Sequence, residues 1–423
     1  MKKAFTIVAK NYIGLAKVLR KSINMQNPEV EFLIFVADEP NEDYRGENGV
    51  LFAKEVVDIS QTIWKEMAFK YDITEFCTAI KPFCFKYMMG LDGTESVMYF
   101  DPDIYVFSSL DCLYEKLDKY SILLVPHIIQ ANLKNNSDIV FLNSGIYNLG
   151  FLGLKKSNTS LDMLEWWGRK LIDNCYDDIL DGTFTDQKWM NFATTLFPIE
   201  EVYVSQHLGV NIAPWNFYER EIIFETKKLY VKSRINNSNM QPVIFVHYSG
   251  FDYRNLLFGE CKRNRIEDVY IDFDDIQKLI ALYTEKMNDE KTMMLEYLSL
   301  PYSYNSFTNG VKIMKFHRRI YRSIIQRETI KNPFDCNGSL YKRLLQKKIF
   351  VLDNSSEITP TSPIVGKLKY FNLIMRLVYK LFGYNRYIAL LRLMKYFSKY
   401  ESQIFLLDDK YLTSNIDLLN RNN

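Results

Sequence analysis

The feature that most constrains the fold is an alternation of short apolar runs with amphipathic segments between residue 3 and about residue 260. Four apolar runs have the length of buried strands, at residues 4–9, 31–37, 96–100 and 243–247. Intervening segments such as 12–23 carry apolar residues at helical spacing. Strands that alternate with helices predict an α/β fold, in which a mostly parallel sheet is covered by helices. Ligands bind such sheets at the carboxyl ends of the strands.

Composition and cysteine usage exclude several classes of protein. The chain has 423 residues, a net charge of +2 and 48% hydrophobic residues, which indicates neither a nucleic-acid-binding polycation nor a disordered chain. Its six cysteines form no CxxC pair, which argues against a zinc site or a disulfide framework. The start of the sequence has only a short apolar stretch before Lys10, which predicts no signal peptide, and no apolar run is long enough to span a bilayer. We therefore expect a cytoplasmic protein with no nucleic-acid partner.

A change in character after residue 260 predicts further parts. We expect an α/β domain, a helical extension, a linker and a basic helical C-terminal segment, at residues 1–260, 261–352, 353–363 and 364–423. Between residues 367 and 399 the chain has eight Lys or Arg residues and no Asp or Glu, interleaved with Leu, Ile, Phe and Tyr. Such basic amphipathic helices either pack on the α/β domain or make peripheral contact with an anionic membrane on the inner face of the cell.

Two aspartates follow the apolar run at 96–100. In the segment YFDPDIY, Asp101 and Asp103 are two positions apart, and they project to the same side of the chain. Their carboxylates repel each other unless a cation lies between them, and Mg²⁺ and Mn²⁺ take oxygen ligands and complete their shells with substrate phosphates. A pair of solvated turn residues is the alternative interpretation. The position at the end of a strand favours a divalent-metal site.

A polar, glycine-containing segment follows near residue 143. Asn143 and Ser144 precede a stretch that we expect to form a strand at residues 144–154. Glycine there would let a ligand approach the backbone, and Asn and Ser would supply hydrogen bonds. A bulged strand with no ligand is the alternative.

Two further segments add titratable and polar side chains. Asp186 and Gln187 are expected to open a helix at residues 186–194, with Thr185 as its N-cap. The alternative is that Asp186 only complements the helix dipole. His247 ends the apolar run at 243–247, where a neutral imidazole would complete a carboxylate-rich metal site, although a lone histidine is more often structural.

Taken in order, five segments resemble the GT-A glycosyltransferases, and among them glycosyltransferase family 8, which includes bacterial lipooligosaccharide galactosyltransferases and glycogenin. The segments are VAKNYIG, YFDPDIYVF, NSGIYNLGFLGLKK, TDQKWMN and FVHYSG, between about residues 3 and 254. The resemblance implies a GT-A (Rossmann-like) fold, a nucleotide-sugar donor and retention of the anomeric configuration. The family's last motif usually continues to Lys-Pro-Trp, whereas this chain reads FDYR at residues 251–254.

The resemblance also implies roles for single residues. The nucleotide-sugar would be bound by Ala9, Asn11, Tyr12, Lys81, Asp101, Asn143, Ser144 and Arg254. The metal, Mn²⁺ or Mg²⁺, would be ligated by Asp101, Asp103 and His247. The reacting sugar would face the implied catalytic residues Asp186 and Gln187. Lys86 competes with Lys81 for the position over the diphosphate.

These observations predict an enzyme. We expect a metal-dependent hexosyltransferase that moves a sugar, UDP-linked by preference, to a glycan or glycolipid acceptor in bacterial surface polysaccharide or lipopolysaccharide synthesis. The acceptor is expected near residues 207–220, where Trp215 either offers a stacking surface or belongs to the core. Two alternatives stay open. A sugar nucleotidyltransferase is disfavoured by the single glycine in AKNYIGLAK, and a non-catalytic glycan-binding or scaffold protein would share the fold.

Overall fold

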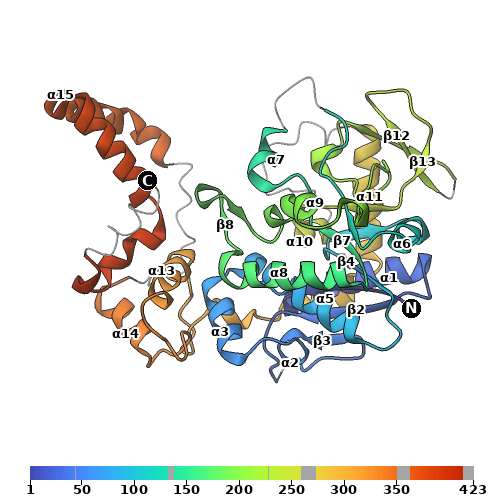
Figure 1. Ribbon diagram of the computed structural model, residues 1–423, viewed down its shortest axis with the longest axis horizontal. Helices are drawn as coiled ribbons and strands as arrows, with labels where there is room; N and C mark the ends of the chain where they lie inside the picture. Colours follow the sequence, from blue (N-terminus) through green and yellow to red (C-terminus); the bar gives the residue numbers. More distant parts are fainter. Residues whose placement is uncertain (43, 132–137, 227, 259–272, 350–362, 413–423) are drawn as a thin grey trace. The chain divides into compact units, whose positions relative to one another are not determined.

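The computed structural model describes the chain except for residues 43, 132–137, 227, 259–272, 350–362 and 413–423 (Figure 1). Its contacts divide the chain into two units, residues 1–67 with 73–303 and residues 68–72 with 304–423. The division differs from the boundary expected at residue 260, because helices α11 (Asp274–Asn288) and α12 (Lys291–Leu298) pack into a core of the first unit. The expected linker, apart from the first residue of a helix at 363, lies outside the described residues.

A seven-stranded sheet forms the centre of the first unit. Its spatial order is β10 (Val202–Val204), β6 (Ile122–Leu124), β7 (Phe151–Lys155), β4 (Ser96–Phe100), β1 (Lys2–Val8), β2 (Glu31–Val36) and β3 (Val50–Phe52). Neighbouring strands are parallel except where β7 pairs with β4 and with β6. The predicted fold class, a mostly parallel α/β sheet followed by a helical C-terminal region, is confirmed.

The strand β1 shows why this sequence forms a covered sheet. Ala4 and Val8 pack in one cluster with residues of α1 (Ile13–Gln26) and α6 (Asp111–Leu117). Phe5 points to the other face, where its ring packs edge-on against Phe85 of α5 (Lys81–Gly90) with centroids 4.8 Å apart. Because successive strand residues point to opposite faces, a strand covered on both faces needs an unbroken apolar run.

The other elements of the first unit surround this sheet. The remaining helices are α2 (Ala53–Val56), α3 (Gln61–Lys70), α4 (Ile73–Ala79), α7 (Ile139–Ser144), α8 (Asn158–Asn174), α9 (Ala193–Leu196) and α10 (Tyr253–Leu257). Smaller sheets are formed by β14 (Phe245–His247) with β5 (Ile104–Val106), by β8 (Asp177–Asp178) with β9 (Thr183–Phe184), and by β11 (Arg220–Phe224), β12 (Leu229–Ser233) and β13 (Gln241–Pro242).

Two elements differ from those expected. The prediction of one strand over residues 144–154 is wrong in its first half, because α7 ends at Ser144, Gly145 turns the chain with φ 109°, and β7 begins only at Phe151. The prediction that Thr185 caps a helix is also wrong. Its φ is 44°, its hydroxyl donates to Oδ1 of Asp186 at 3.2 Å, and the 3₁₀-helix η3 (Lys188–Phe192) follows, continuing into α9.

The second unit is helical, with α13 (Lys315–Ile325), α14 (Ser339–Gln346) and α15 (Pro363–Phe397). The buried Arg318 of α13 shows why residues 68–72 belong to this unit. Its Nη1 donates to the carbonyl oxygens of Ala68, Phe69 and Tyr71 at 3.1, 2.8 and 2.7 Å. Phe69 also packs edge-on against the ring of Tyr321, with centroids 4.7 Å apart.

The helix α15 is two helices joined at Gly383. Gly383 has φ 75° and ψ 174°, which interrupts the helical backbone. The rings of Tyr379 and Tyr387 pack edge-on across this break with centroids 5.4 Å apart. Among the residues that the structure describes, no helix has the length and apolar character needed to cross a membrane.

Candidate active site

Three predicted ligand side chains meet beyond the end of β4. Asp101 and Asp103 follow that strand, and His247 is the last residue of β14. The antiparallel pairing of β14 with β5 sets His247 opposite Ile104, next to Asp103. One ligand atom from each of the two aspartates and the histidine lies within 4.8 Å of the others. The fold therefore brings together residues that are far apart in sequence.

This cluster, Asp101–Asp103–His247, is buried on the imidazole side and partly open on the carboxylate side. The side chain of His247 is 3% exposed, while those of Asp101 and Asp103 are 30% and 29% exposed. Nε2 of His247 lies 3.1 Å from Oδ1 of Asp103 and 3.7 Å from Oδ2 of Asp101. Burial lowers the pKa of the imidazole, but the carboxylates of Asp103 and Asp101 outweigh burial and raise it above its usual value. For the Asp101 carboxyl, burial disfavours the charged form and therefore raises the pKa.

Asn148, which sequence analysis did not single out, orients the histidine. Nδ1 of His247 lies 3.1 Å from Oδ1 of Asn148, an amide oxygen that accepts, so Nδ1 donates there and Nε2 faces the two carboxylates. Metal-ligating histidines commonly have such a partner, which fixes the tautomer and the ring orientation. Nδ2 of Asn148 donates in turn to Oε1 of Gln187 at 3.3 Å. The histidine is thus held in the orientation that a cation would need, with Nε2 toward Asp101 and Asp103.

Gly150 leaves the space that the ligand side chains occupy. A Cβ at this position would lie 2.4 Å from Cε1 of His247 and 2.8 Å from Oδ2 of Asp101. The carbonyl of Gly150 also accepts a hydrogen bond from the backbone N–H of Asp101 at 2.7 Å. Two carboxylates and an oriented imidazole, against a wall that carries no side chain, fit Mn²⁺ or Mg²⁺.

A buried ion pair lies next to the Asp101–Asp103–His247 cluster. Nζ of Lys81 lies 2.6 Å from Oδ2 of Asp186 and donates to the carbonyl of Leu149 at 2.8 Å, and the two charged side chains are 1% and 3% exposed. Burial raises the pKa of the Asp186 carboxyl, and Lys81 opposes this effect. Tyr99 links the pair to the cluster, because its ring lies 4.1 Å from Nζ of Lys81 and its hydroxyl donates to Oδ1 of Asp101 at 2.5 Å.

Gln187 connects the ion pair to the segment after α7. Its Oε1 accepts the backbone N–H of Leu149 at 3.2 Å, and its Nε2 donates to the carbonyl of Ser144 at 2.8 Å. Ser144 therefore joins the site through its backbone, and its hydroxyl bonds within α7. Asn143 is exposed on the last turn of that helix. Lys86 pairs with Glu165 of α8 at 2.5 Å, so Lys81 is the lysine that lies at the site.

The residues expected to bind the nucleotide gather near Asp103. Tyr12, in the 3₁₀-helix η1 (Lys10–Tyr12), packs edge-on against Tyr253 with ring centroids 4.7 Å apart. Burial, followed by the nearby Tyr253 and Asp103, raises the pKa of Tyr12 to about 12. Arg254 is exposed at the start of α10 and hydrogen-bonds the Tyr253 side chain. An aromatic pair with one cation thus stands beside the carboxylates.

Two buried polar atoms at this site have no hydrogen-bond partner among the described residues, Oδ1 of Asn11 and Nε1 of Trp215. The ring of Trp215 packs edge-on against His247 with centroids 5.3 Å apart, which places the predicted acceptor residue beside a predicted metal ligand. Ala9 is 2% exposed, and its carbonyl accepts the N–H of Tyr12 at 2.9 Å. Buried polar atoms without partners are rare, and a bound ligand is one way to satisfy them.

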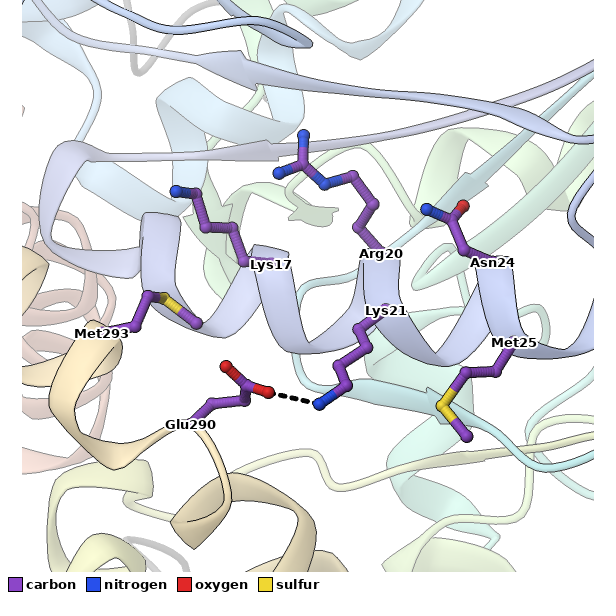
Figure 2. A pocket seen from close by; sticks show the side chains of 7 residues that line it. All are labelled: Lys17, Arg20, Lys21, Asn24, Met25, Glu290 and Met293. Atoms are coloured by element: carbon purple, nitrogen blue, oxygen red, sulfur yellow. Dashed lines mark hydrogen bonds and ion pairs between the residues drawn. The ribbon is translucent and has the colours of Figure 1, made fainter.

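A pocket of about 410 Å³ lies elsewhere, between α1 and α12 (Figure 2). It is lined by Lys17, Arg20, Lys21, Asn24, Met25, Glu290 and Met293, and an ion pair joins Lys21 to Glu290. None of the residues predicted to bind donor, metal or acceptor lines it. It is therefore separate from the candidate active site.

Comparison with known proteins finds a similar protein and similar structures but assigns the chain to no family. No protein-family model matches the chain. The uncharacterised protein YfnF of Bacillus subtilis (strain 168) is 27% identical over 195 residues, 45% of this chain and 61% of that relative, so the match spans less than two thirds of its length.

Three solved structures similar to this chain are glycosyltransferases. The galactosyltransferase LgtC, in complex with donor and acceptor sugar analogues, is 16% identical with a TM-score of 0.39, covering 71% of this chain and 97% of its own. A glycosyltransferase involved in glycosylation of the major capsid of PBCV-1 is 10% identical with a TM-score of 0.33, covering 58% and 93%. Mouse xyloside xylosyltransferase 1 is 10% identical with a TM-score of 0.34, covering 59% and 97%.

Proposed function

We propose that this protein is a metal-dependent glycosyltransferase that moves a hexose from a nucleotide-diphospho-sugar, UDP-linked by preference, to a glycan or lipid-linked acceptor. The observation that carries the proposal is the convergence of Asp101, Asp103 and His247 beyond a strand end of a mostly parallel sheet, where α/β proteins bind ligands. The ordered motif segments support the same activity. By their resemblance, the reaction retains the anomeric configuration and serves bacterial surface polysaccharide or lipopolysaccharide synthesis.

The roles of the chain's own groups follow from their contacts. Asp101, Asp103 and His247 would hold Mn²⁺ or Mg²⁺, which when bound supplies positive charge to a departing nucleoside diphosphate. Tyr99 and Asn148 hold Asp101 and His247 in position by hydrogen bonds. A metal site whose ligands are already oriented costs no reorganisation when charge develops on the leaving group.

The other side of the site is assigned to the two sugars. Asp186 and Gln187 would face the donor sugar, where carboxylate and amide oxygens stabilise a ring with oxocarbenium character. The Tyr12 and Tyr253 rings with Arg254 form the wall that we assign to the nucleotide. Trp215, whose Nε1 has no partner among the described residues, is assigned to the acceptor.

A donor screen tests the proposal. The protein is incubated with a panel of UDP- and GDP-sugars, and release of nucleoside diphosphate is measured with Mn²⁺, after chelation, and after Mn²⁺ is restored. We expect release from at least one donor that stops on chelation and returns with the metal. Whether UDP or GDP is released then shows which nucleotide base the protein accepts.

Two further assays separate the alternatives. Given a sugar phosphate and a nucleoside triphosphate in place of the donor panel, a nucleotidyltransferase would form a nucleotide-sugar and pyrophosphate. A binding module would bind a nucleotide-sugar, seen by calorimetry, with no release of diphosphate across the panel. Either result would contradict the proposed activity.

A further inference from the structure

The first half of α15 exposes an unusual amount of apolar surface. Met375 is 9% exposed, but nine other large side chains are between 47% and 68% exposed, namely Leu368, Tyr370, Phe371, Leu373, Ile374, Leu377, Tyr379, Leu381 and Phe382. In α14 of the same unit, Leu340 and Leu344 are at most 1% exposed, so this unit has a core and these side chains are outside it. Exposed apolar surface of this extent marks an interaction site.

The charge of α15 has one sign. Its cations, with one that follows the helix at 399, are Lys367, Lys369, Arg376, Lys380, Arg386, Arg392, Lys395 and Lys399, and residues 367–399 contain no Asp or Glu. Lys369, Arg376 and Lys380 are seven and four positions apart and share one face of the first helix. No acidic group within the hairpin is present to neutralise them.

The length and charge of the first helix decide how it would meet a membrane. Pro363–Phe382 spans about 30 Å at helical rise, close to the thickness of the bilayer core, but four cations interrupt it. Such a segment lies in the interface, with apolar side chains among the acyl chains and cations at the headgroups. Gly383 then returns the chain as a second helix, in which Tyr384 beside the break is 66% exposed and Leu391, Leu393, Met394 and Phe397 are 37–40% exposed.

Charge also selects the partner. A second copy of this chain would set one set of cations against an identical set, which opposes association by like-charge repulsion. An anionic lipid surface offers both complements at once, negative headgroups and apolar chains. We propose that the α15 hairpin, residues 367–397, binds in the plane of an anionic phospholipid bilayer, with its first helix inserted more deeply than its second. This inference concerns the second unit and is independent of the proposed activity.

Vesicle binding by the full chain tests the proposal. Sedimentation with vesicles of phosphatidylcholine alone is compared with vesicles containing about a third phosphatidylglycerol, at low and at high salt. We expect binding to the anionic vesicles that weakens strongly with salt, because surface charge is screened. The triple variant Lys369→Gln, Arg376→Gln, Lys380→Gln should lower the partition coefficient about a hundredfold.

A matched variant separates this surface from charge in general. Lys342, Lys347 and Lys348 are exposed at α14, so changing all three to Gln removes the same charge from the same unit. This control should change vesicle binding by less than about threefold. Equal losses in both triple variants, or no binding of the unchanged chain to anionic vesicles, would overturn the proposal. Circular dichroism checks that each variant keeps its helix content.

Depth is measured with a reporter in the first helix. Phe371→Trp is compared with Leu393→Trp on vesicles that carry brominated acyl chains, each corrected for the quenching of the unchanged chain. We expect stronger added quenching at position 371 than at 393. Equal quenching would reject the predicted depth order. Light scattering without lipid is run alongside, and a dimer that the variant Leu377→Ser dissociates would assign the hairpin to a second copy instead.

Discussion

The site beyond β4 and the hairpin of α15 differ in which side chains they bury. The site buries polar and charged groups, whereas the hairpin exposes apolar ones. At the site, charged groups lie in a largely buried setting and are held by neighbours of the same chain, as Asn148 holds His247 and Lys81 holds Asp186. On the hairpin, apolar groups such as Leu381, 68% exposed, stand in water. The first arrangement is preorganised for a small ligand, and the second requires a large partner.

The largest effect is expected from Asp103→Asn. This change removes a charged ligand candidate whose side chain is 29% exposed, so the free energy of unfolding should change little while turnover falls about a thousandfold. Donor turnover with Mn²⁺ and thermal unfolding are measured together. Asp92→Asn, at an exposed turn, is the control. Near-normal turnover of the Asp103 variant with Mn²⁺ present would remove the cluster from the mechanism.

A smaller effect is expected from Gly150→Ala. The new Cβ would meet Cε1 of His247 and Oδ2 of Asp101 at 2.4 and 2.8 Å, so one ligand must move and Mn²⁺ affinity should fall about 10- to 100-fold. Calorimetric titration with nucleoside diphosphate present measures it. Gly90→Ala, where a Cβ meets nothing within 4 Å, is the control. Equal Mn²⁺ affinities of this variant and the unchanged chain would show that the positions of His247 and Asp101 do not limit metal binding.

A smaller effect than that of either substitution is expected from lowering the pH, which should weaken Mn²⁺ binding at the site. The pKa of His247 is raised above its usual value because Asp103 and Asp101 outweigh burial, and a cation can bind only the unprotonated ring. Mn²⁺ affinity should therefore fall about tenfold per pH unit below that raised pKa and level off above it. His247→Ala should bind more weakly and lose this step. A step of the same size in the variant would assign it to another group.

The smallest effect is expected on the hairpin. Leu377→Ala, at a side chain 56% exposed, should change the free energy of unfolding by less than about 0.5 kcal/mol. Leu344→Ala in α14, where the side chain is fully buried, should cost about 2–5 kcal/mol. Chemical denaturation of both variants compares them within one unit. A large loss for Leu377 would mean that the chain itself covers the hairpin in solution.

Much of this architecture is predictable because it depends on local patterns. The apolar run of β1 and the position of Asp101 after β4 follow from residue order alone. The meeting of Asp103 and His247 is implied by the family resemblance and not by strand order, because β14 pairs antiparallel with β5 outside the seven-stranded sheet. Its distances depend on the β5–β14 register, which no spacing in the sequence specifies.

The rest depends on partners that only the tertiary structure selects. Asn148 was one of several polar residues in its segment, and its role arises because Gly145 redirects the chain and Val125 accepts its backbone N–H. Thr185 precedes a sequence that is typical of a helix start, yet it does not cap a helix. Asp186 forms a buried ion pair with Lys81, and the backbone of Thr185 has a positive φ of 44°. Local propensity gave way to burial of a charge, which needs its counterion.

The contacts of Arg318 have a consequence for how the chain is made. The guanidinium that satisfies the carbonyl of Ala68 stands 250 residues later in the sequence. At ordinary rates of translation, about 5–20 residues per second, the segment around Phe69 leaves the ribosome about 10–50 s before its partner is synthesised. During that interval the ring of Phe69 and the three carbonyl groups that Arg318 binds have no native partner. Nascent chains paused between these two points would be the form of this protein that most needs a chaperone.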